Sequence, residues 1–128
     1  MLPQDLLASV PDVIVDTPNG EKFIVAEVRI NDHKKLVIRA LNKCKYHFDI
    51  ETKLRAEVRP LGLSAWCVGG GKYRIDAPLK TILIWSESGE FGREVDRKKT
   101  VEMLQQAFPE FVVIAPDNLT ALSMDLEL

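Results

Sequence analysis

The fold of this chain is decided by one stretch, KFIVAEVRI, at Lys22–Ile30. It is rich in β-branched residues, and its side chains divide between two faces in alternation, as they do along a strand. The first face carries Ile24, Ala26, Val28 and Ile30, and the second carries Phe23, Val25, Glu27 and Arg29. The stretch therefore predicts a strand with two distinct faces.

The residues around this strand predict a hairpin. Asn31–Lys34 has the composition of a polar turn in which we expect His33 to be exposed, and Leu36–Ala40 follows as the returning strand. Before the strand, Thr17–Gly20 supplies turn chemistry, because Asn-Gly tolerates positive φ and proline restricts the turn. Asp12–Val15 alternates only weakly.

Helical spacing replaces the strand pattern after the hairpin. Ile50, Leu54 and Val58 recur every four residues with charged residues between them, which predicts an amphipathic helix. We expect Pro60 and Gly62 to end it.

A second helix is predicted over Val95–Phe108. Val101, Leu104 and Phe108 fall on its buried side, and Asp96 lies near its start, where a carboxylate suits the helix dipole. The remaining strands are expected at Leu63–Val68, Tyr73–Ile75, Thr81–Trp85 and Phe111–Ala115.

These elements predict a single α+β domain over residues 1–128: a mixed sheet of about six strands with two main helices packed on it. Each helix must cover part of a sheet face. We expect two peripheral segments, Met1–Val10 as a lead-in whose leucines pack on the domain edge, and the tail from Asp117 as irregular chain. A length of 128 residues suits one domain.

Composition narrows the classes of function. A net charge of -2 argues against nucleic acid as a partner, because a polyanion would need a local basic patch. The sequence has no apolar run long enough to span a bilayer and no signal-peptide pattern, so we expect a cytoplasmic protein without a membrane partner. We also expect a monomer. Cys44 and Cys67 are expected to be reduced thiols, and the scattered Cys and His residues predict no metal site.

His47 is the first candidate for chemistry, because it stands where the strand pattern changes to the helix pattern. Imidazole has an unperturbed pKa of about 6.5, which suits proton transfer or nucleophilic attack near neutral pH. A cap or a half-buried packing residue is the structural alternative at such a boundary.

Gly69–Gly71 followed by Lys72 suggests a phosphate loop, but the spacing of a Walker motif is absent. The alternative is a bulge or a close crossing at a strand end. Cys67 and Arg74 resemble the cysteine and arginine of a thiol phosphatase with one residue too many between them, so a buried strand cysteine is favoured.

The loop Ser86–Gly92 lies between a predicted strand and a predicted helix, where backbone amides are often free to bind an oxyanion. Turns have the same composition. By default, Lys22 and Arg39 are solvated charges on the hairpin strands.

Together these segments resemble the Janus/Ocnus family of small phosphohistidine phosphatases over nearly the whole chain. The segments that carry the resemblance are Val10–Val13, Gly20–Phe23, Val37–Arg39, Tyr46–His47 with Asp49–Ile50, Cys67–Gly71, Ser88–Gly92 and Phe108–Phe111. Their order and spacing are more specific than any one of them.

The resemblance implies hydrolysis of phosphohistidine in proteins, with phospholysine as an open alternative, and without a metal or cofactor. The family's catalytic histidine falls on His47, and its substrate-binding lysine falls on Lys22. The phosphate-holding loop falls on Ser88, Gly89 and Glu90 and acts largely through backbone groups. Arg39 and Lys72 are the two further cations expected near the phosphate. His47 acts either as general base on water, which we favour, or as a nucleophile that forms a transient phosphoimidazole.

The chain also departs from the family pattern. Lys72 replaces the usual arginine after the glycines, which keeps the charge but loses the bidentate fork. Glu87 and Glu90 add carboxylates to the loop. The alternative function is therefore a weakly active or inactive family member that binds phosphate or protein in a regulatory, developmental role of the sex-related kind known in the family.

Overall fold

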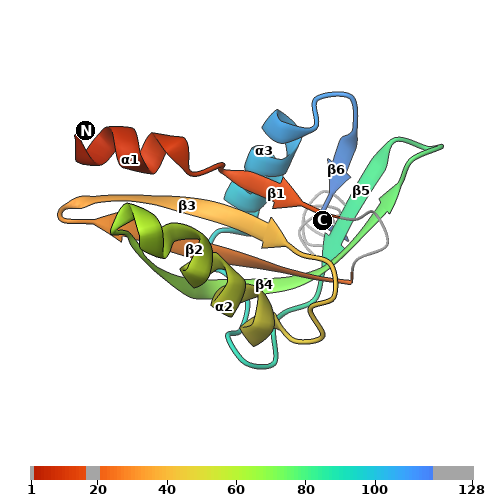
Figure 1. The fold of residues 1–128 in the computed structure, drawn as a ribbon. Coiled ribbons are helices and arrows are strands. Elements are labelled where there is room, and N and C mark those ends of the chain that lie inside the picture. Colours follow the sequence, from red (N-terminus) through yellow and green to blue (C-terminus); the bar gives the residue numbers. More distant parts are fainter. Residues whose placement is uncertain (1, 17–20, 117–128) are drawn as a thin grey trace, which may run out of the picture.

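The computed structural model describes residues 2–16 and 21–116, and within them the chain forms three α-helices and one six-stranded mixed sheet (Figure 1). The predicted single α+β domain is confirmed in its architecture. The expected turn at Thr17–Gly20 and the expected irregular tail from Asp117 lie outside the described residues.

The sheet has the strand order β1-β3-β2-β4-β5-β6. The strands are β1 (Val13–Val15), β2 (Lys22–Ile30), β3 (His33–Ala40), β4 (Ser64–Asp76), β5 (Thr81–Trp85) and β6 (Val112–Ile114). The four central strands pair antiparallel, whereas β1 and β6 pair in parallel with β3 and β5 at the two edges. The helices are α1 (Pro3–Ser9), α2 (His47–Val58) and α3 (Arg97–Ala107), and a 3-10 turn, Arg59–Leu61, follows α2.

Strand β2 divides the core into two layers, as its alternation predicts. Ile24, Ala26 and Val28 pack with α1 and α2 on one face, whereas Phe23 and Val25 pack on the face that α3 covers. In Figure 1, α2 lies in front of the central strands and α3 lies behind them. The helices thus cover opposite faces of one sheet.

The predicted helix pattern of α2 is confirmed, because Ile50, Leu54 and Val58 are at most 1% exposed. Burying such a side chain contributes about 1.5–3 kcal/mol. Past α2, Gly62 adopts φ +77°, a left-handed conformation that glycine tolerates best. Asp96 is the N-cap of α3, and its carboxylate accepts a hydrogen bond from the amide of Lys99.

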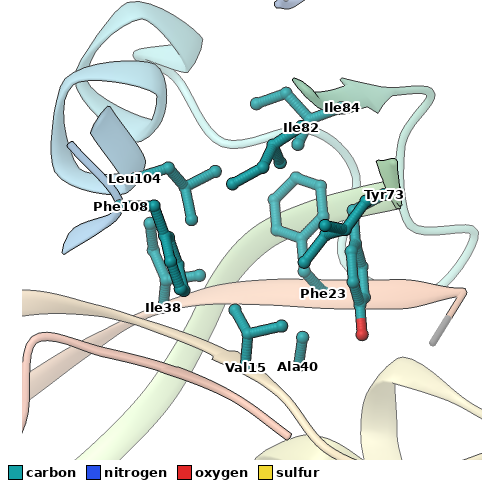
Figure 2. Close-up of a pocket in the computed structure, with 10 residues that line it drawn as sticks. Val15, Phe23, Ile38, Ala40, Tyr73, Ile82, Ile84, Leu104 and Phe108 are labelled. Carbon is teal, nitrogen blue, oxygen red and sulfur yellow. The ribbon is translucent and has the colours of Figure 1, made fainter. Parts of the chain in front are cut away.

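The layer under α3 holds a small cavity of about 10 Å³ (Figure 2). It is lined by Val15, Phe23, Ile38, Ala40, Tyr73, Ile75, Ile82, Ile84, Leu104 and Phe108. None of these side chains carries a charge, and the space is no larger than a single water molecule needs. The cavity is therefore a packing defect of the core and is not a candidate ligand site.

Three details of the prediction were wrong. The hairpin turn is shorter than expected: His33 and Lys34 pair in β3 with Ile30 and Arg29, although His33 is exposed as predicted. The turn needs only two residues because Asn31 adopts φ 53°.

The other two errors concern the number of elements. Leu63–Val68 and Tyr73–Ile75 were expected as separate strands, but β4 runs unbroken through the three glycines. The lead-in contains a helix, α1, with Pro3 in its first turn and with Leu7 only 6% exposed. Within the described ranges, no helix is long and apolar enough to cross a membrane.

Candidate active site

His47 is the first residue of α2 and is only 3% exposed. The helix begins here because Tyr46 is extended and its amide donates to the Asp49 carboxylate at 2.9 Å, one half of a capping box. This start turns the His47 ring toward the sheet. In Figure 1, the beginning of α2 lies beside the loop that follows β5.

Among the described residues, the His47 ring makes one hydrogen bond, between Nε2 and the carbonyl oxygen of Gly71 at 3.0 Å. A carbonyl oxygen can only accept, so Nε2 must carry the proton. In the neutral ring, Nδ1 then holds the lone pair. The backbone of β4 thereby selects the tautomer in which Nδ1 can act as base or nucleophile.

Gly69–Gly71 gives this region its close packing. A Cβ on Gly70 would lie 3.2 Å from Cδ2 of His47 and 2.2 Å from the carbonyl oxygen of Phe23. A Cβ on Gly69 would lie 2.1 Å from the amide nitrogen of Glu94. The pairing of β2 with β4 also shifts register just before the glycines. The bulge and close crossing considered for this motif are both present, and a phosphate loop of the Walker type is not.

Lys22 and Lys72 face each other across β2 and β4. Lys72 lies two residues beyond Gly70 in β4, so its side chain is on the sheet face that carries His47, about 7 Å along the strand. Directly paired residues have Cβ atoms about 5 Å apart, and like charges at that distance destabilise a sheet. The Lys22 ammonium is 4.0 Å from Glu21, and Lys72 has no ion pair within the described residues. This pair of cations can accommodate an anion.

The Ser88–Gly92 loop closes on itself. Ser88 and Gly92 exchange two backbone hydrogen bonds, and the buried Ser88 hydroxyl accepts from the amides of Glu90 and Phe91. The Gly92 carbonyl also accepts from the amide of Gly70, which places the loop against the glycines beneath His47. Among the described residues, the amide of Gly89 has no partner, so it is the loop amide available to a ligand.

A buried ion pair at the start of α3 holds this loop. Arg97 donates to both carboxylate oxygens of Glu94 and to the carbonyl oxygens of Gly70 and Ser86. Glu94 also accepts from the hydroxyl of Thr100. The sequence interpretation missed these residues. Their signal was helical spacing, because Arg97 and Thr100 fall on the same side of α3 as the buried Leu104.

Arg39 is placed differently from the other candidate residues. Its side chain is 0% exposed, its Nε and Nη2 donate to the Glu57 carboxylate, and its Nη1 donates to the carbonyl of Ile38. It shares a cross-strand row with Ile24 and Gly70, two strand spacings, or about 10 Å, from Gly70. The structure thus uses Arg39 to connect β3 with α2.

Cys67 and Arg74 do not form a thiol phosphatase site. They lie in the same strand, seven residues and about 23 Å apart. Burial raises the pKa of the Cys67 thiol to about 12, and its sulfur donates to the carbonyl of Gly69. The strand cysteine was the correct interpretation, although Cys67 is half-buried and not fully buried.

The two acidic side chains of the loop, Glu87 and Glu90, are exposed. In the part of the chain that the structure describes, no three His, Cys, Asp or Glu side chains gather in a way that could hold a metal ion.

A buried histidine of defined tautomer, a lysine pair and a braced loop thus meet at one end of an α+β domain. The model of the Janus/Ocnus family matches residues 7–112. The chain belongs to the Janus/Ocnus family.

Two relatives show the range of names in this family. The sex-regulated protein janus-A of Drosophila yakuba is 28% identical over 116 residues, which cover 90% of this chain and 85% of that protein. The 14 kDa phosphohistidine phosphatase of Sus scrofa is 25% identical over 119 residues, which cover 88% of this chain and 94% of that protein. The family resemblance seen in the sequence is confirmed.

Proposed function

We propose that this protein is a protein-histidine phosphatase that works without a metal ion and uses Nδ1 of His47 as a general base. The observation that carries the proposal is the hydrogen bond from Nε2 to Gly71, which leaves the lone pair on Nδ1. The name of the Sus scrofa relative supports phosphohistidine as the substrate class. Phospholysine stays an alternative with the same P–N bond.

Lys22 and Lys72 supply the charge that the reaction needs. A phosphoryl group carries negative charge over its oxygens, and positioning and electrostatic stabilisation account for most of its catalysis. An anion between the two ammonium groups would also relieve their mutual repulsion across the strands. We assign the direct phosphate contacts to these lysines, with the Gly89 amide as a third donor.

The Ser88–Gly92 loop has few free hydrogen-bond donors, so its main contribution to the proposed site is its shape. The amides of Ser88 and Glu90 already have partners inside the loop, so we assign these residues the role of presenting the Gly89 amide. Arg39 is omitted from the direct contacts because each of its guanidinium nitrogens has an acceptor.

In the reaction, His47 takes a proton from water at Nδ1 as the water oxygen forms its bond to phosphorus. The P–N bond breaks, the electron pair leaves with the substrate nitrogen, and that nitrogen takes up a proton. The alternative is direct attack of Nδ1 on phosphorus, after which water hydrolyses the phosphoimidazole. Both routes use the same lone pair.

A second function is favoured by the loop carboxylates. Glu87 and Glu90 are exposed beside the site, and their charge opposes the approach of a phosphate. The janus-A name of several relatives also carries no catalytic description. A regulatory module that binds phosphate or protein is therefore the competing proposal.

The deciding experiment measures phosphate release from a histidine-phosphorylated protein by wild type, His47→Ala and His33→Ala. His33 is the matched control, because it is exposed in the β2–β3 hairpin. We expect His47→Ala to lose at least about 100-fold in kcat, the typical contribution of a general base. His33→Ala should keep the wild-type rate.

Equal rates for wild type and His47→Ala would overturn the catalytic assignment. No release by wild type, together with measurable binding of inorganic phosphate, would favour the regulatory module. Far-ultraviolet circular dichroism and a urea titration of each variant check that the fold is retained.

A further inference from the structure

We propose that a groove at the C-terminal end of α2, the end away from His47, binds an acidic, extended segment of the protein substrate. The assignment of the partner as substrate rests on the proposed function. The groove itself is defined independently, by its shape and its charges.

The groove has a volume of about 400 Å³ and is formed where α2 and the following turn meet the first residues of β4. It is lined by Arg55, Arg59, Leu63, Ser64, Ala65 and Trp66. In contrast with the closed cavity under α3, it is large enough for several side chains of a bound peptide.

The charges in the groove are positive although the whole chain is acidic, with a net charge of -2. Arg59 is exposed and has no ion pair within the described residues, and the Arg55 side chain is 52% exposed. Arg55 forms an ion pair with Glu51, with Nη2 3.5 Å from Oε2, and the Glu51 side chain is 7% exposed and also accepts from the amide of Cys67. Of the two groove arginines, Arg59 is therefore the one left to attract carboxylates from outside.

The backbone adds a donor at the same place. Ala65 accepts from Nε of Arg55 through its carbonyl, and the amide of Cys67 donates to Glu51, so both groups point away from β2. In an extended strand, the N–H and C=O of one residue point the same way, so the Ala65 amide faces this edge too. An extended peptide can accept a hydrogen bond from it.

Trp66 also lines the groove. Arg29 lies over its ring, 5.2 Å from the centroid, and is itself paired with Glu27 at 3.1 Å. Tryptophan and arginine are the residue types that most often dominate binding energy at interfaces. An acidic peptide that also carries apolar side chains would match both features.

The groove is connected to the candidate active site by one strand. From Ala65 to Gly70 is five residues of β4, or about 17 Å. A bound segment of about five extended residues can therefore reach from the arginines to the histidine site. This geometry would let the groove select substrates with acidic residues at that distance from the phosphohistidine.

The test uses the full chain and a fluorescein-labelled ten-residue peptide of alternating glutamate and valine, without a phosphate. Fluorescence anisotropy is measured for wild type, Arg59→Glu and Lys98→Glu. Lys98 is the matched control, because it is exposed on α3 and undergoes the same charge change. Neither side chain is buried, so both variants should fold.

We expect Arg59→Glu to weaken binding about tenfold and Lys98→Glu to change it less than about twofold, because only the first reverses a charge in the groove. Binding to wild type should also weaken as salt rises from 50 to 500 mM. No binding by wild type, or equal weakening by the two variants, would contradict the proposal that the groove binds an acidic peptide. A lysine–valine peptide that binds equally well overturns the acidic preference.

Kinetics test the substrate assignment separately. The ratio of KM for an acidic phosphohistidine protein to KM for a small phosphoramidate should rise about tenfold in Arg59→Glu and stay at its wild-type value in Lys98→Glu. An unchanged ratio in Arg59→Glu overturns the assignment of the partner as substrate. If no variant releases phosphate, the proposed function fails, while the peptide measurement still decides the groove.

Discussion

Gly70 shows how one missing side chain positions a histidine. We expect Gly70→Ala to lower the free energy of unfolding by about 3 kcal/mol, because its Cβ would overlap the Phe23 carbonyl and press on the His47 ring. Urea denaturation with an unchanged m-value measures the loss. Gly89→Ala is the control, because a Cβ there meets nothing within 4 Å, and its change should stay within about 0.5 kcal/mol. Equal losses would contradict the crowding at Gly70.

Cys67 makes stability depend on alkaline pH. Its pKa is raised from the ordinary 9.0 to about 12, chiefly by burial and further by the carboxylates of Glu51, Glu90 and Glu94. Between these values the unfolded chain releases the thiol proton and the folded chain keeps it, so the free energy of unfolding falls as pH rises from 9 to 12. We expect Cys67→Ala to lose less stability than wild type between pH 9 and pH 11. Parallel losses in urea titrations at the two pH values would show that the thiol contributes nothing.

At the scale of single residues, the sequence predicts which residues are candidates better than it predicts what those residues contact. His47 could be selected from the printed sequence because imidazole suits the chemistry and the residue stands at a change of pattern. The tautomer of His47 could not be predicted from the sequence, because the hydrogen-bond acceptor of Nε2 is a backbone carbonyl 24 residues away in the chain. Arg39 shows the same limit, since the carboxylate that engages it, Glu57, is 18 residues away and on another element.

At the scale of helices and strands, the ion pair between Arg39 of β3 and Glu57 of α2 gives the most direct prediction. Glu57→Gln leaves the fully buried Arg39 guanidinium uncompensated, so we expect it to lower the free energy of unfolding by about 3 kcal/mol. Arg39→Met leaves only the Glu57 carboxylate, whose side chain is 32% exposed, so its loss should be smaller. Chemical denaturation measures this. KM for the phosphorylated substrate should change equally little in both variants when assayed at 15 °C. A KM that rises only in Arg39→Met would instead assign Arg39 to the phosphate, as the family resemblance implies.

Strand β2 and strand β5 were predicted at their observed bounds because alternation and β-branched residues are local signals. Strand β4 was predicted in two pieces, because three consecutive glycines are usual in turns. They stay in the strand here since Phe23, His47, Trp85 and Glu94 occupy the space around them. Helix α1 was missed because it is only seven residues long and is held by Leu7 against the sheet.

At the scale of the whole molecule, the proposed phosphate site combines four segments that are far apart in the chain. The start of β2 brings Lys22, the start of α2 brings His47, the middle of β4 brings Lys72 and the glycines, and the loop after β5 brings Gly89. The sheet order places β2 beside β4, and α2 crosses the face that they share. Only the family resemblance could join these segments from the sequence, because their spacing along the chain carries no common motif.

The candidate active site and the proposed peptide groove lie at different positions along β4. The candidate active site lies at the glycines, and the arginine groove lies at the strand's beginning, so one bound polypeptide could contact both. Helix α3 and its Glu94–Arg97 pair support the loop from the opposite face of the sheet. The fold therefore positions both sites through β4.

The most direct test of the central claim, that these four segments form one phosphate site, is a ¹H–¹⁵N NMR titration of the full chain with inorganic phosphate at pH 7. We expect the amide signals of Lys22, His47, Lys72 and Gly89 to shift together with a single dissociation constant. Sodium chloride at matched ionic strength controls for salt. Shifts confined to the residues of the arginine groove, or no shift at these four amides, would contradict the account.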